Sequence, residues 1–219
     1  MPAKNALKKY DRDQMWHVYN RGVDKGVIFT DEKDYTVFLS YLKVALSPEL
    51  DDDDKSAAVS YLDVERLRRL NLHGDVELVS YCLLPNHFHL QLYQHSEDGI
   101  SKLMRSIATG YSMYFNKRHE RSGTLFQGRY KASHVKTDDY WTHLSRYIHM
   151  NALDAGSSLE RYKYSSYKYY VGEVSCPPWV NPSKSISQFT SISDYRDFCH
   201  SYIGRKEELA GFKEVLANH

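Results

Sequence analysis

Two histidines separated by one residue form the part of this sequence best suited to chemistry. His87-Phe88-His89 stands in the segment LPNHFHLQL (residues 84–92), and residues 79–83 before it alternate as in a strand. Residues i and i+2 of a strand point to the same face of a sheet, so both imidazoles project together and Phe88 faces the other way. Histidine is the commonest protein metal ligand, and this spacing therefore predicts that the pair holds one metal ion.

A second pair of polar side chains lies near the end of a predicted helix. Tyr147 and Asn151 are four residues apart, so they share one helical face. If this face lies over the sheet, the Asn151 amide oxygen can complete a metal shell with His87 and His89, and the Tyr147 hydroxyl lies beside it. Such a shell leaves positions open for water and a phosphate, as in a catalytic site. Nitrogen and oxygen ligands suit Mg²⁺ or Mn²⁺, and zinc would also fit.

The elements that must position these residues alternate between strand and helix patterns. Strands are predicted over residues 15–20, 76–84, 87–93 and 126–135, and helices over 31–46, 57–70, 99–120 and 138–150. The order predicts an α+β fold of the ferredoxin-like or RRM-like split βαβ type, β-α-β-β-α-β. We expect an antiparallel sheet with helices on one face, a trailing helix that carries Tyr147, and a loop-rich C-terminal extension with a short helix at about 206–216.

Composition indicates a globular protein of 219 residues, enough for one domain with a full core plus an extension. No run approaches the ~20 apolar residues of a membrane span, and residues 1–13 lack the apolar core of a signal peptide. The cysteines, Cys82, Cys176 and Cys199, are widely spaced, which argues against a disulfide scaffold or a zinc ribbon and predicts a reducing, cytoplasmic setting.

The charge of the chain is unevenly distributed. The formal net charge is +1, but residues 102–136 hold eight lysines and arginines and one acid, Glu120. Several of the 19 tyrosines lie among these cations. Rings interleaved with positive charge suit base stacking and neutralisation of phosphates, so the sequence favours single-stranded nucleic acid as a partner over a merely solvated basic face.

Four ordered blocks of sequence resemble a known family. His87-Phe88-His89 resembles the HUH motif (histidine, bulky hydrophobic, histidine) of single-tyrosine transposases of the insertion-sequence-200 type, above all their REP-associated tyrosine transposase branch. The other blocks are WHVYNRG (16–22), GTLFQGRYKA (123–132) and YIHMN (147–151). The likeness spans residues 14–156, which we expect to be the catalytic domain, with 157–219 as an extension packed on it or flanking it. Ala152 departs from the pattern, which usually has proline there, and we expect this to alter only the helix end.

The resemblance implies a prokaryotic, nucleoid-associated enzyme that cleaves and rejoins single-stranded or hairpin DNA and depends on Mg²⁺ or Mn²⁺. It places the nucleophile on Tyr147, the metal ligands on His87, His89 and Asn151, and a 5′-phosphotyrosine in the reaction. Since a second subunit completes the site in some members, it allows a homodimer. Water or His149 could serve as the base, although His149 at i+2 should point away from Tyr147.

Expected contacts to the DNA backbone are Arg121, Arg129 and Lys131, with Arg21 as a weaker candidate. Two other functions stay open at this point. One is a non-catalytic DNA-binding protein on the same fold, which would not need His87, His89, Tyr147 and Asn151 together. The other is a nickase of the relaxase or replication-initiation type, which usually has helicase segments or clustered tyrosines that this sequence lacks.

Overall fold

The computed structural model describes residues 11–49 and 71–203. The strands are β1 (Gln14–Arg21), β2 (Val76–Leu84), β3 (His87–Gln94) and β4 (Lys131–Val135). The longer helices are α1 (Glu32–Leu46), α4 (Gly99–Arg118) and α5 (Asp138–Met150), and the shorter ones are η1 (Val23–Lys25), η2 (Asn151–Ala155), α6 (Tyr167–Tyr170), α7 (Ser183–Ile186) and α8 (Ile192–His200). The helices predicted at 57–70 and 206–216 lie outside the described residues.

The strands form one four-stranded antiparallel sheet in the order β2-β3-β1-β4. This is the strand order of a split βαβ fold, so the predicted fold class is confirmed. Pro85 and Asn86 make the turn between β2 and β3, as the sequence predicts, and His87 is therefore the first residue of β3.

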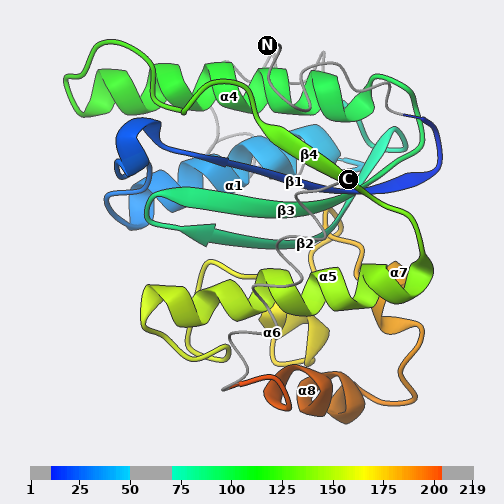
Figure 1. Ribbon diagram of the computed structural model, residues 1–219. Coiled ribbons are helices and arrows are strands. Elements are labelled where there is room, and N and C mark those ends of the chain that lie inside the picture. The colour runs from blue at the N-terminus through cyan, green and yellow to red at the C-terminus, as the bar shows by residue number, and fades with distance from the viewer. Residues whose placement is uncertain (1–10, 50–70, 204–219) are drawn as a thin grey trace, which may run out of the picture.

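One face of the sheet is covered by α1 and α4, which also pack on each other (Figure 1). Phe88 points to this side and contacts Phe38 of α1, with ring centroids 5.1 Å apart. Helix α1 begins where predicted, because the Asp31 carboxylate accepts hydrogen bonds from the backbone N–H groups of Lys33 and Asp34.

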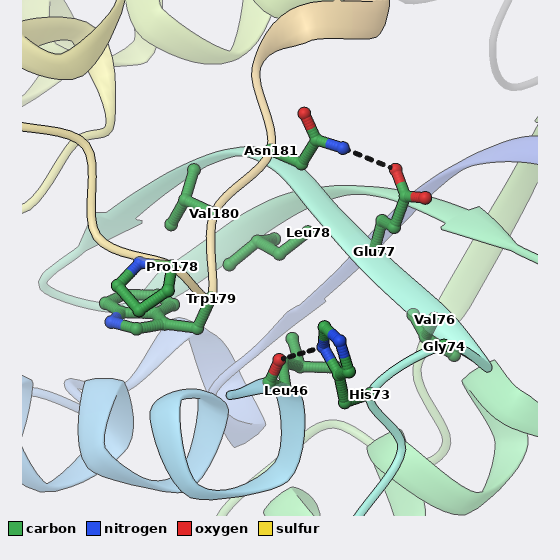
Figure 2. A pocket seen from close by; sticks show the side chains of 10 residues that line it. All are labelled: Leu46, His73, Gly74, Val76, Glu77, Leu78, Pro178, Trp179, Val180 and Asn181. Carbon is green, nitrogen blue, oxygen red and sulfur yellow. Dashed lines mark hydrogen bonds between the residues drawn. The ribbon is translucent and has the colours of Figure 1, made fainter. Parts of the chain in front are cut away.

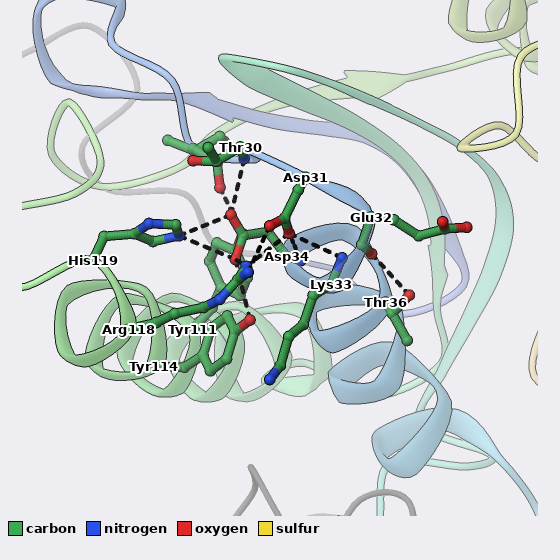
Figure 3. Close-up of polar contacts among 11 residues, drawn as sticks. Thr30, Asp31, Glu32, Lys33, Asp34, Thr36, Tyr111, Tyr114, Arg118 and His119 are labelled. Atoms are coloured by element: carbon green, nitrogen blue, oxygen red, sulfur yellow. Dashed lines mark hydrogen bonds and ion pairs between the residues drawn. The ribbon is translucent and has the colours of Figure 1, made fainter.

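A buried ion network fixes the start of α1 to the end of α4 (Figure 3). Asp34 is fully buried and accepts hydrogen bonds from Arg118, His119 and the Tyr114 hydroxyl. Arg118 also donates to both carboxylate oxygens of Asp31. A buried carboxylate is stable only when it is paired and hydrogen-bonded, and these donors meet that requirement.

Helix α5 covers the opposite face of the sheet, where it contacts β2, β3 and β4 (Figure 1). The two helices of the split βαβ unit, α1 and α4, thus share one face of the sheet as predicted, and the trailing helix α5 lies on the other face. Residues of β2 and β3 are accordingly buried along nearly their whole length, on both faces of the sheet.

The part of the extension that the structure describes, residues 157–203, packs against α5 and the same face. Arg146 of α5 lies between two aromatic rings of this segment, 3.9 Å from the Phe198 centroid and 3.4 Å from that of Tyr202. These contacts bury the side of α5 that faces away from the sheet.

Strand β4 is shorter than predicted. Residues 126–130 are not part of it, because Phe126 makes only an isolated bridge to Gly22 and Gly128 has a φ of +91°, in the left-handed region that glycine favours. The connection between α4 and β4 therefore ends in a loop before the strand starts at Lys131.

Candidate functional site

Strand register gathers the predicted site residues on the face that α5 covers. His87 pairs with Arg21 and His89 with Tyr19, and residues directly opposite on paired strands project to the same face. His17, two residues before Tyr19, shares this face. The two rings of the His87 and His89 pair lie 5.1 Å apart, nearly perpendicular at 84°.

Each histidine of the pair has a defined Nδ1 contact. The Nδ1–H of His87 donates to Asn86 Oδ1 at 2.7 Å, so its Nε2 bears the lone pair. His89 Nδ1 lies 2.9 Å from His17 Nε2, and the two rings stack at 5.1 Å. Metal-binding histidines usually use one ring nitrogen for the ion and the other for such a second contact.

His17 is a site residue that neither the His87/His89 spacing nor the Tyr147/Asn151 spacing in the sequence singles out. It is 3 % exposed, and burial lowers its pKa from 6.5 to about 3, so it is neutral at pH 7. The signal was present in the sequence. Alternation along residues 15–20 puts His17 and Tyr19 on one face, and the split βαβ topology makes that strand the neighbour of His89.

Tyr147 reaches this group of imidazoles from α5. Its ring contacts those of His17 and His89 edge-on, each at a centroid distance of 5.7 Å. Burial raises the pKa of the Tyr147 phenol above its ordinary value of 10.0, and a hydrogen bond with the Asn151 side chain acts in the opposite direction. The phenol is thus protonated at neutral pH and lies beside the histidines within a single chain.

Asn151 lies one turn after Tyr147, at the C-terminal end of α5, and is 4 % exposed. Its Nδ2 donates to the backbone carbonyls of Tyr147 at 2.8 Å and Ile148 at 3.3 Å. These bonds fix the amide so that Oδ1 is the atom able to bind a cation.

A buried glutamine holds α5 in place over the histidines. Gln91 lies two residues after His89 and is fully buried. Its Oε1 accepts from Ser145 Oγ of α5 at 2.8 Å, and its Nε2 donates to the Trp141 carbonyl at 2.9 Å. Because such buried polar bonds require defined geometry, they fix the position of Tyr147 relative to the sheet.

His87, His89 and Asn151 together offer too few ligands to fill the shell of a divalent ion, so further ligands must come from outside the protein. Among residues 11–49 and 71–203, no three His, Cys, Asp or Glu side chains cluster closely enough to hold a metal. Two imidazoles and an amide oxygen are neutral donors that leave positions for phosphate oxygens and water, which suits Mg²⁺ or Mn²⁺.

The four predicted DNA-binding cations fall into two groups. Arg21 lies opposite His87 and bonds to Gln127, and Lys131 lies opposite Tyr19, so both belong to the site face. Arg129 is exposed in the loop before β4. Arg121 follows α4 and lies 5.7 Å from the Phe115 centroid, on the other side of the sheet.

His149 does not take part in this site. It is fully buried, and its two ring nitrogens lie 2.8 Å from the Tyr195 hydroxyl and from Ser166 Oγ. Both partners belong to the segment after α5, so His149 anchors that segment and is not available as a base for Tyr147.

A separate cavity of about 320 Å³ lies beside β2 (Figure 2). Its polar groups are paired with each other, since Asn181 donates to Glu77 at 3.0 Å and the His73 ring donates to the Leu46 carbonyl at 3.2 Å. None of the predicted site residues lines it. This cavity is therefore distinct from the candidate site.

Within the part of the chain that the structure describes, no helix has the length and apolar character needed to span a membrane.

Comparisons with known proteins agree with the resemblance found in the sequence. Residues 64–151 match the family model described as "Transposase IS200 like". The fold is similar to that of a solved REP-associated tyrosine transposase bound to a REP hairpin, with a TM-score of 0.52, 14 % sequence identity, and coverage of 80 % of this chain and 90 % of that one. No curated protein matches in sequence. The resemblance is thus confirmed: residues 64–151 match the IS200-like transposase family, and the chain shares its fold with a REP-associated tyrosine transposase.

Proposed function

We propose that this protein is a transposase-type enzyme that cuts and rejoins single-stranded DNA with Tyr147 as nucleophile. The observation that carries the proposal is the edge contact of the Tyr147 ring with His89 at 5.7 Å, with Asn151 one helical turn away. A protein that only binds DNA has no need of this combination. Hairpin DNA is the substrate we favour, because the solved transposase of similar fold is bound to a REP hairpin.

His87, His89 and Asn151 are the residues that would hold the divalent ion. When bound, the ion would withdraw charge from the scissile phosphate and favour the phenolate form of the nearby tyrosine. Arg21 and Lys131 flank the histidines on the same face and would contact the phosphates on either side.

The chemical step is a transesterification at phosphorus. Tyr147 Oη loses its proton and forms a bond to the phosphorus, and the bond from phosphorus to the 3′ oxygen breaks. The 3′ oxygen takes up a proton, which leaves a 5′-phosphotyrosine and a free 3′-hydroxyl. Because one phosphoester replaces another, attack by a second 3′-hydroxyl reverses the step and joins strands without ATP.

The test is formation of a covalent adduct. The protein is incubated with hairpin DNA labelled on the 3′ side of the cleavage site, with Mn²⁺ or with EDTA, and separated under denaturing conditions. We expect a labelled adduct with Mn²⁺ that is absent with EDTA and in Tyr147→Phe. Tyr19→Phe is the matched control, since Tyr19 also stacks near His89, at 5.9 Å, and this variant should retain the adduct.

Two results would contradict the proposal. An adduct in Tyr147→Phe would exclude this residue as the nucleophile. Tight hairpin binding with no cleavage under any metal condition would favour the non-catalytic DNA-binding function instead.

A further inference from the structure

A groove of about 620 Å³ lies between α4 and the loop that leads into β4, on the other side of the sheet from His87 and His89. In Figure 1 the connection after α4 turns back across this helix before it enters β4. Buried Met104, Leu125 and Phe126 form the apolar floor, and Met113 is 64 % exposed at the side. The groove therefore presents apolar surface to solvent.

Positive charge surrounds this floor. Arg105 and Arg129 are both exposed, and Tyr130 lies beside them, half-buried. None of the residues that line the groove is acidic. An apolar floor with cations and an aromatic ring at its rim is complementary to unpaired nucleotides, whose bases are flat and apolar and whose phosphates are anionic.

The loop side of the groove is held in place by bonds to both of its neighbours. Asn20 Nδ2 of β1 donates to the Gly128 carbonyl at 3.1 Å, and Gln127 N donates to the Arg21 carbonyl at 2.8 Å. Asn116 Nδ2 of α4 donates to the Gly123 carbonyl at 2.9 Å. A groove held in this way needs little ordering when a ligand binds, which lowers the entropic cost of binding.

The loop that lines the groove leads directly into β4, the strand whose first residue belongs to the face of the candidate site. Strand β4 is an edge strand, and its first residue, Lys131, lies on the site face opposite Tyr19. Arg129 and Tyr130, which come directly before it, line the groove. For a DNA strand that passed from the histidines over Lys131, Tyr130 and Arg129 would therefore be the next neighbours along the chain.

We propose that this groove binds the unpaired nucleotides that flank the hairpin, with their bases against Tyr130 and Met113 and their phosphates near Arg105 and Arg129. The inference rests on the proposed function, because it takes single-stranded DNA as the substrate. It adds a binding site on the face of the sheet opposite to the reacting groups.

The test measures binding without cleavage, in Tyr147→Phe as the parent protein. Fluorescence anisotropy gives the affinity for a blunt hairpin and for the same hairpin with single-stranded flanks. Three changes are then compared with the parent: the pair Arg105→Ala and Arg129→Ala, the single change Tyr130→Leu, and Arg196→Ala on α8 as a control on the other helical layer.

We expect the flanked hairpin to bind the parent more tightly than the blunt one. Each phosphate contact to a single strand contributes about 0.7 to the slope of log affinity against log salt concentration. The variant that lacks both arginines should therefore show a slope lower by about 1.4 for the flanked hairpin. Tyr130→Leu should weaken the same DNA about 5-fold or more through lost stacking. The blunt hairpin and the Arg196→Ala control should not change.

The outcomes separate this inference from the proposed function. If the parent binds neither DNA, the proposed function fails and the groove assignment fails with it. If the parent binds the flanked hairpin and the groove variants match it in affinity and salt slope, the groove assignment alone is wrong. Photo-cross-linking from 5-iodouracil in the flank provides a second measurement, since the inference requires adducts on Tyr130 or Met113 and cross-links only elsewhere would overturn it.

Discussion

Acid is expected to destabilise the fold through His149, which links α5 to the segment that follows it. Burial lowers the pKa of this imidazole from 6.5 to about 3. Below pH 6.5 the unfolded chain therefore binds a proton that the folded chain does not, and the free energy of unfolding falls as the pH falls toward 3. Each pH unit below 6.5 lowers the free energy of unfolding by about 1.4 kcal/mol through this group. Titration of His149 alone should therefore lower the free energy of unfolding by about 2 kcal/mol between pH 7.5 and pH 5.

The assay is urea unfolding, followed by circular dichroism, at a series of pH values from 7.5 to 5. The parent protein is compared with His149→Gln, which keeps a polar side chain near Tyr195 and Ser166 but does not titrate. His17 has a similarly lowered pKa and is present in both proteins, so the difference between their pH slopes isolates His149. The reasoning would be refuted if His149→Gln lost stability as steeply as the parent over this range.

Three further predictions concern the site and the ion network. His17→Phe removes the contact to His89 Nδ1 and should weaken Mn²⁺ binding, measured by calorimetry, about 10- to 100-fold. His17→Gln should lose less affinity. If His17→Phe bound Mn²⁺ as tightly as the parent protein, this contact would have no role in metal binding. The Arg118 guanidinium lowers the pKa of Asp31 from 3.8 to about 2. The contribution of this ion pair to the stability of the fold is therefore present above pH 3.8 and is lost toward pH 2. Thermal melts of Asp31→Asn should therefore depend less on pH between 4 and 2 than those of the parent, and an unchanged dependence would count against this ion pair. Lys131→Ala should weaken single-stranded DNA binding for all sequences and lower the salt slope by about 0.7, whereas an unchanged slope would remove Lys131 from the interface.

Much of the fold was predictable because its signals are local. Alternation over residues 79–83 and the Pro85-Asn86 turn indicate β2 and β3, and the Asp31 carboxylate marks the start of α1 by satisfying backbone donors. In a split βαβ fold these elements have one preferred arrangement, so the side-by-side strands that carry His17 and His89 followed from the order of the elements.

The remainder depended on tertiary contacts that local patterns do not encode. Gln91 helps to hold α5 on its face of the sheet, and its bonds to Ser145 and to the Trp141 backbone join residues far apart in the sequence. The late start of β4, at Lys131, depends on the left-handed backbone of Gly128, which a strand pattern does not show. Helices α6 and α7 have only four residues each, too short for a hydrophobic period to be recognised.

The most direct test of the central claim is to identify the residue that becomes linked to DNA. The covalent adduct is digested with a protease and a nuclease, and the peptide that keeps a nucleotide is sequenced by mass spectrometry. The account predicts a 5′-phosphate linked to Tyr147, formed only when Mn²⁺ or Mg²⁺ is present. Attachment to Tyr19, the other tyrosine in ring contact with His89, would contradict it.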